Sequence, residues 1–160
     1  MNIQKVLEYA LQREFEGKRF FEENSARLQS AAAAGAFKAI AAEEQKHIEF
    51  IQSQLDALTG DKSAPAPELP TAGFFADRAE SESIADTVME SMVADLPVLR
   101  MAYLIERDFA EFYAMSASKA EGDAKKTLDM LAKWEAGHEK LFKKMHDELF
   151  EKYADMPWGG

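Results

Sequence analysis

Carboxylate and imidazole side chains interrupt stripes of apolar residues, at helical spacing, that would otherwise be expected to face a core. In AAEEQKHIEF, residues 41–50, Glu44 and His47 follow Ile40 at the steps of three and four residues that keep side chains on one helix face. A charged side chain on a buried face is costly unless other groups compensate it. Similar interruptions recur along the chain, so the fold must bring compensating groups to these positions.

Four stripes of this kind predict four long helices. The helices are expected over residues 2–29, 32–58, 95–121 and 123–153. Their apolar stripes run from Ile3 to Leu28, from Phe37 to Leu58, from Leu96 to Tyr113 and from Leu128 to Leu149. Asn2 and Asp95 are the expected N-caps of the first and third helices. The connection over 59–94 starts with a Pro- and Gly-rich loop and includes a predicted short helix over 80–93.

This pattern favours an all-α, ferritin-like four-helix bundle made of two helical hairpins joined by one long crossover. The 160 residues suit a single domain, 1–160. With a net charge of -10 the chain lacks the basic face that nucleic acid needs. It has no cysteine for disulfides or thiolate sites. Without an apolar signal core or membrane span, we expect no membrane association and a soluble, cytoplasmic protein.

Six polar residues on the stripes are expected at one height in the bundle. They are Glu14, Glu44, His47, Glu106, Glu135 and His138. At about 1.5 Å per residue, Glu14 and Glu44 lie roughly 24 Å and 21 Å from the turn that joins their helices. An internal repeat supports the match, since EFEGKRFF resembles ERDFAEFY and EEQKH resembles WEAGH. All six residues can therefore meet in one layer.

Two divalent cations would balance the charge of four carboxylates in a dry core. Without cations, such a cluster must be protonated. One Glu from each of two helices, with Glu-x-x-His from each of the other two, is the ligand pattern of dimetal carboxylate bundles. The residues therefore predict a dinuclear metal site. Oxygen-rich ligands with imidazole suit iron or manganese, alone or mixed, and admit adventitious zinc. The alternative is a pair of ordinary core histidines, hydrogen-bonded to neighbours.

Three further residues lie close to these positions in the sequence. Tyr113, two turns after Glu106, can hydrogen-bond a ligand carboxylate, carry redox chemistry or simply pack in the core. Gly17, one turn after Glu14, is expected to leave space beside a metal. Trp134 carries no pattern that points to a function.

The segments REFEGKRFF, AAEEQKH, LIERDFAEFY and WEAGH resemble the ferritin-like superfamily, most closely its rubrerythrin-type branch, over residues 3–153. The resemblance implies a di-iron centre with dimers or larger assemblies. Its terminal ligands would be Glu14 and Glu106, its bridging ligands Glu44 and Glu135, and its histidine ligands His47 and His138.

The sequence departs from the rubrerythrin pattern at two points. Rubrerythrins proper carry a rubredoxin-like iron site with four cysteines, which this chain lacks. They also have an additional Glu one turn after the third-helix ligand, where this chain has Phe109; the equivalent in the first helix is Gly17. The remaining six ligands resemble those of ferritins and bacterioferritins equally well.

The resemblance implies an enzyme of oxidative-stress defence, a di-iron peroxidase or oxidase. It would reduce H₂O₂ or O₂ with electrons from a separate donor such as a rubredoxin-like protein. One alternative is a ferroxidase that serves iron storage or delivery. A second alternative is a non-catalytic scaffold whose helices the metals staple together.

Overall fold

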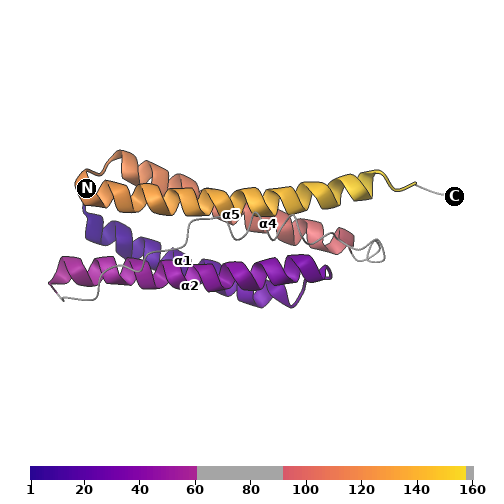
Figure 1. Cartoon of the computed structure of the whole chain (residues 1–160), viewed down its shortest axis with the longest axis horizontal. Helices are drawn as coiled ribbons and strands as arrows, with labels where there is room; N and C mark the ends of the chain where they lie inside the picture. Colours follow the sequence, from indigo (N-terminus) through magenta and orange to yellow (C-terminus); the bar gives the residue numbers. More distant parts are fainter. Residues whose placement is uncertain (61–91, 158–160) are drawn as a thin grey trace.

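The computed structural model describes residues 1–60 and 92–157. It has four long helices: α1 (Ile3–Ser25), α2 (Ala31–Thr59), α4 (Met92–Ser118) and α5 (Gly122–Ala154). The helices form two hairpins, α1 with α2 and α4 with α5 (Figure 1). This confirms the expected all-α four-helix bundle. The short helix predicted over 80–93 lies outside the described residues, except for its last two positions, which belong to α4.

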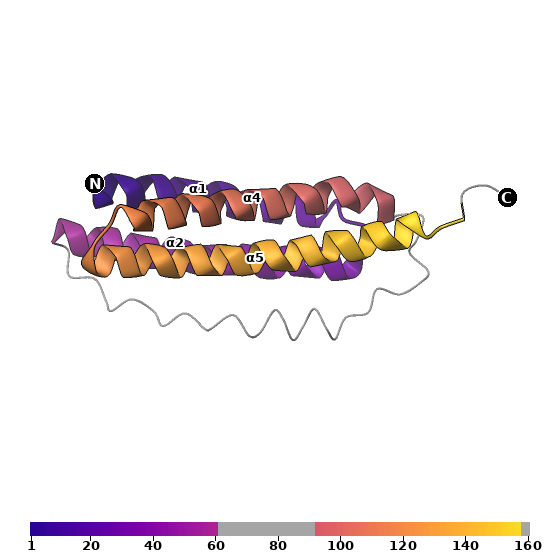
Figure 2. The same ribbon diagram turned by 90° about the horizontal axis from the view of Figure 1, so that it is seen from above.

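The two hairpins lie against each other with α1 beside α4 and α2 beside α5 (Figures 1 and 2). The end of α2 and the start of α4 lie at opposite ends of the bundle (Figure 2). These two helices therefore run parallel. This parallel arrangement of α2 and α4 agrees with two hairpins joined by one long crossover.

Polar side chains define the ends of the first hairpin. The Asn2 side chain accepts a hydrogen bond from the Lys5 amide at 3.2 Å and caps α1 as predicted. The helix ends at Ser25 rather than at residue 29, because Asn24 and Ser25 turn back to bond carbonyl groups of its last turns. Gly60 ends α2 in the left-handed conformation, with φ of 86°, where a side chain would be strained.

Asp95 does not cap the helix that it was expected to begin. The helix α4 starts three residues earlier, at Met92, and Asp95 lies buried near its first turn. Its carboxylate accepts hydrogen bonds from the backbone amides of Gln29 at 2.9 Å and Ser30 at 2.8 Å. The residue thereby joins the start of α4 to the turn between α1 and α2.

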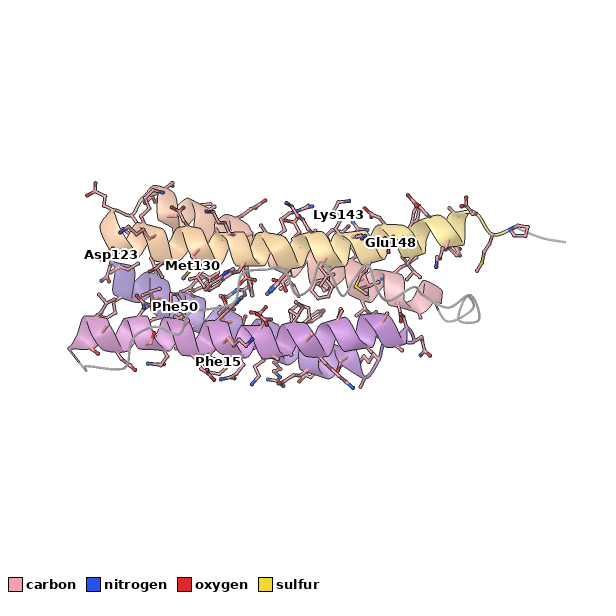
Figure 3. The ribbon with its side chains drawn as sticks, viewed as in Figure 1. Phe15, Phe50, Asp123, Met130, Lys143 and Glu148 are labelled. Carbon is pink, nitrogen blue, oxygen red and sulfur yellow. The ribbon has the colours of Figure 1, made fainter. Side chains whose placement is uncertain are left out.

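Two apolar clusters fill the bundle on either side of a polar layer. In one cluster the rings of Phe21, Phe37 and Phe142 pack with centroids 5.2 to 5.3 Å apart. The other cluster includes Phe50, which lies between α2 and α5, whereas Lys143 projects outward (Figure 3). Leu58 was expected on the buried stripe of α2 but is 51% exposed, because it lies in the last turn of the helix, past the buried Leu55.

Candidate metal centre

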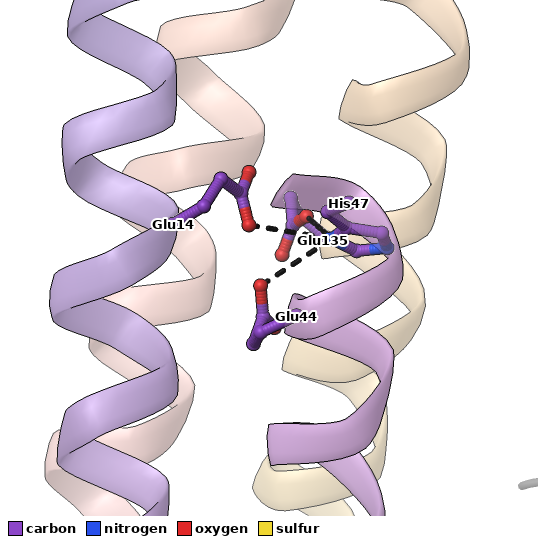
Figure 4. A group of neighbouring side chains, drawn as sticks. All are labelled: Glu14, Glu44, His47 and Glu135. Carbon is purple, nitrogen blue, oxygen red and sulfur yellow. Dashed lines mark hydrogen bonds and ion pairs between the residues drawn. The ribbon is translucent and has the colours of Figure 1, made fainter. Parts of the chain in front are cut away.

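The six polar residues predicted from the sequence meet in the layer between the two apolar clusters. All four glutamates are fully buried, and His47 and His138 are 2% and 7% exposed. Their ligand atoms form two groups in which the atoms lie within 4.8 Å of one another. The Glu14 group consists of Glu14, Glu44, His47 and Glu135 (Figure 4). The Glu106 group consists of Glu44, Glu106, Glu135 and His138.

Both groups contain Glu44 and Glu135, and these two carboxylates divide their oxygens between the histidines. Glu44 places Oε2 3.3 Å from Nδ1 of His47 and Oε1 3.3 Å from Nδ1 of His138. Glu135 places Oε1 2.9 Å from Nδ1 of His47 and Oε2 3.4 Å from Nδ1 of His138. Each shared carboxylate therefore presents one oxygen to each half of the site.

Burial and charge set the protonation of the outer pair of glutamates. Burial raises the pKa of Glu14, and the negative charges of Glu135 and Glu44 raise it further, well above its usual value. Burial and the charge of Glu44 likewise raise the pKa of Glu106. These pKa shifts favour the protonated form of both outer carboxyl groups when no metal is bound.

The pKa values of the shared glutamates and of the histidines shift as they do in ion pairs: those of the glutamates fall and those of the histidines rise. Burial opposes the charged form of Glu44, but the neighbouring Glu14 carboxyl group and the charge of His47 hold its pKa below the usual value. The pKa of Glu135 is also lowered against burial and the charge of Glu44, by His47 and His138. Burial would lower the pKa of both histidines, yet the surrounding carboxylates raise it well above the usual value.

These pKa shifts balance in charge, since they favour protons on the two outer carboxyl groups and the two imidazoles and disfavour them on the two shared carboxylates. Even so, both carboxylate oxygens of Glu44, Glu106 and Glu135 lack a well-aligned hydrogen-bond donor within residues 1–60 and 92–157. Buried oxygens without such donors, beside two imidazole nitrogens, are a donor set that fits divalent metal ions.

Tyr113 extends the site along α4. Its hydroxyl donates a hydrogen bond to Oε1 of Glu14, on the neighbouring α1. The phenol is almost completely buried, and burial together with the charge of Glu14 raises its pKa well above the usual value. The sequence left three roles open for Tyr113, and the structure shows one of them, a hydrogen bond to a candidate ligand carboxylate.

Trp134 lies directly beside the site, although its sequence context gave no functional indication. The indole stacks on the imidazole of His47, with centroids 5.1 Å apart and planes 12° apart. On its other side His47 stacks on His138, at 5.5 Å and 11°. The position next to Glu135 places Trp134 in the polar layer, but nothing in the sequence tells which helix its ring faces.

The space expected beside Gly17 is filled. The ring of Phe109 lies so close to Gly17 that a Cβ atom there would meet it at 3.0 Å. The guanidinium of Arg13 covers this ring, 5.5 Å from its centroid. The expectation of free space beside a metal at Gly17 was therefore wrong, because an aromatic side chain from α4 occupies it.

No helix in the described part of the chain is long and apolar enough to cross a bilayer. The family model described as Rubrerythrin matches residues 5–146. The structure is similar to that of a hypothetical protein from Pyrococcus furiosus, with a TM-score of 0.69 and 18% sequence identity over 94% of this chain and 92% of that chain. At this identity the likeness bears on the fold alone. No curated protein matches the chain.

Proposed function

The chain belongs to the rubrerythrin family, and on that premise we propose that it is a di-iron oxidoreductase. It would reduce hydrogen peroxide, or O₂, with electrons from a separate donor protein, as a defence against oxidative stress. The proposed ligands are Glu14, Glu44, His47, Glu106, Glu135 and His138.

The observation that carries this proposal is the division of oxygens at Glu44 and Glu135. An ordinary buried ion pair needs only one carboxylate for each imidazole. Here each shared carboxylate lies between His47 and His138 with one oxygen toward each. That arrangement suits two metal ions: Glu44 and Glu135 would be shared ligands, and Glu14 with His47 and Glu106 with His138 would complete the two sets.

The protein's own residues hold and enclose the metals. Reduced iron would supply the electrons that cleave the O–O bond and the Lewis acidity that polarises it. His47 stacks on both Trp134 and His138. These contacts fix its imidazole plane, so that Nδ1 faces the carboxylates. Tyr113 fixes the orientation of Glu14 through its hydroxyl. The Phe21, Phe37 and Phe142 rings exclude water on one side of the layer.

The cycle also needs protons and further electrons. Reduction of peroxide to water consumes protons as well as electrons, and the protons would come from solvent, because Glu14 and Glu106 would bind metal as carboxylates. The chain contains no cysteine and hence no thiolate iron site of its own. A separate electron-transfer protein therefore completes the proposed cycle.

The test is anaerobic titration of metal-free protein with Fe(II), followed by limiting H₂O₂ with absorbance recorded. We expect saturation at about two irons per chain, as in dimetal carboxylate bundles, and rapid oxidation by peroxide. Glu44→Gln should abolish peroxide turnover. The matched control is Glu43→Gln, one residue away, whose carboxylate pairs with Lys46 outside the site. Unchanged turnover in Glu44→Gln would exclude the di-iron enzyme.

A ferroxidase for iron storage or delivery is the second candidate, favoured by the contact between Phe109 and Gly17. The ring occupies the place of the additional glutamate of rubrerythrins, which leaves a six-residue set like that of ferritins. Iron uptake far beyond two per chain in the same titration, together with a very large assembly on a sizing column, would favour this candidate.

A further inference from the structure

The two halves of the site are supported unequally. The internal repeat pairs Glu14 with Glu106 and His47 with His138, so equivalent neighbours can be compared across the halves. Every difference that follows favours the Glu14 group. Because Glu44 and Glu135 are common to both groups, the differences lie at the outer glutamates and the histidines.

The outer glutamates differ in their hydrogen bonds. Glu14 accepts a hydrogen bond from the Tyr113 hydroxyl. The equivalent of Tyr113 in the first hairpin is Phe21, which has no hydroxyl and packs against Phe37 and Phe142. Neither oxygen of Glu106 accepts a hydrogen bond within the described ranges, and Nδ1 of His138 lies 3.6 Å from its Oε2. Glu14 therefore has a hydrogen bond that Glu106 lacks, and Glu106 has the longer contact with His138.

The histidines differ in what covers them. His47 lies between the indole of Trp134 and the imidazole of His138. The equivalent of Trp134 in the first hairpin is Glu43, which has no ring and pairs with Lys46 at 3.0 Å. The indole therefore supports His47 in a way that Glu43 does not repeat for His138.

We infer that the two groups bind metal unequally: the Glu14 group takes the first ion and holds it tightly, and the Glu106 group binds the second ion more weakly and exchanges it faster. The inference rests on the proposed dimetal centre. Neighbours that fix the orientation of ligands typically change metal affinity by about 10- to 100-fold. We therefore expect dissociation constants that differ by about tenfold or more.

The test is titration of the metal-free full chain with cobalt(II) chloride, in which binding is measured by calorimetry and by visible absorbance. Sequential binding alone does not decide the matter, since two cations in one site repel each other. The matched variants Glu14→Gln and Glu106→Gln do decide it. We expect Glu106→Gln to keep the tight binding step and lose the weak one, and Glu14→Gln to lose the tight step.

A second pair of variants tests the support without changing a ligand. Tyr113→Phe should weaken the tight step by about 10- to 100-fold and leave the weak step unchanged. Tyr103→Phe, the same change on the same helix, should alter neither step, because that ring faces His146, away from both groups. Circular dichroism checks that each variant is folded.

Three results would overturn the inference. Equal effects of Glu14→Gln and Glu106→Gln would show that the halves are equivalent, while leaving the dimetal centre intact. A tight step that survives in Glu14→Gln but not in Glu106→Gln would reverse the assignment. Absence of any cobalt binding by folded wild-type protein would remove the dimetal centre and the proposed function together.

Discussion

The ring of Phe109 on α4 lies against the backbone of Gly17 on α1, with Cε2 3.0 Å and Cζ 3.4 Å from the position that a Cβ atom on Gly17 would occupy. The contact brings the two hairpins together one turn from Glu14. The ring is held on its outer side by Arg13. It therefore has little freedom to move away from a larger residue.

Gly17→Ala should destabilise the protein by about 1 kcal/mol. Overpacking against Phe109 costs about 1–3 kcal/mol, and the gain in helix propensity offsets about 1 kcal/mol. Urea unfolding measures the change. Gly35→Ala in α2 is the control: a Cβ there meets nothing within 4 Å, so it should stabilise by about 1 kcal/mol. If Gly17→Ala also stabilised the protein, the contact would be unimportant.

Asp95→Ala should destabilise the protein by about 2–3 kcal/mol, because it leaves the backbone amides of Gln29 and Ser30 without their acceptor. Asp95→Asn keeps an acceptor oxygen and should cost less. Asp123→Ala is the matched control, since Asp123 also lies in the first turn of a helix but is exposed and pairs with Lys126. If Asp95→Ala and Asp123→Ala lowered the midpoint of thermal unfolding equally, the role of Asp95 would be contradicted.

Metal binding should release protons and tighten as pH rises. Ligands must be deprotonated to bind metal. The raised pKa values of Glu14, Glu106, His47 and His138 favour protons on these groups in the metal-free site. Acidification stabilises these protonated forms and so weakens binding. Calorimetric titration with Zn(II) in two buffers of different ionisation enthalpy counts the protons; release of none would contradict this protonation pattern.

The fluorescence of Trp134 should report metal binding at His47. The indole stacks on the imidazole at 5.1 Å, so a paramagnetic ion such as Co(II) on His47 should quench most of its emission. Zn(II), which has a filled d shell, should leave most of it. Trp158→Phe removes the other tryptophan and isolates the signal. Equal emission with Co(II) and without metal would place the ion away from His47.

The sequence was sufficient for the bundle and for the meeting of the six polar residues, because both follow from helical periodicity. Steps of three and four residues fix which side chains share a face, and equal distances from the turns fix their height. This is why Glu14 and Glu135, more than a hundred residues apart, could be placed in one layer. The structure bears this out in the two overlapping groups.

Contacts that depend on how helices rotate against each other could not be predicted. Periodicity places Trp134 near the layer but does not tell that its ring reaches His47 on α2. The same holds for Phe109 against Gly17, where a missing side chain on one helix receives a ring from another. The prediction that Asp95 caps its own helix was wrong for a related reason. Its carboxylate instead accepts hydrogen bonds from backbone amides in the turn between α1 and α2.

The distribution of the two groups over the hairpins has one further consequence. The hairpin of α1 and α2 supplies three residues of the Glu14 group and only Glu44 of the Glu106 group, and the other hairpin supplies the reverse. Neither hairpin alone carries a complete set. A newly made or damaged chain whose halves have not docked therefore lacks both ligand sets. Under the proposed function, reactive iron would be confined to correctly assembled molecules, and metal content would measure how much of a preparation has reached the native state.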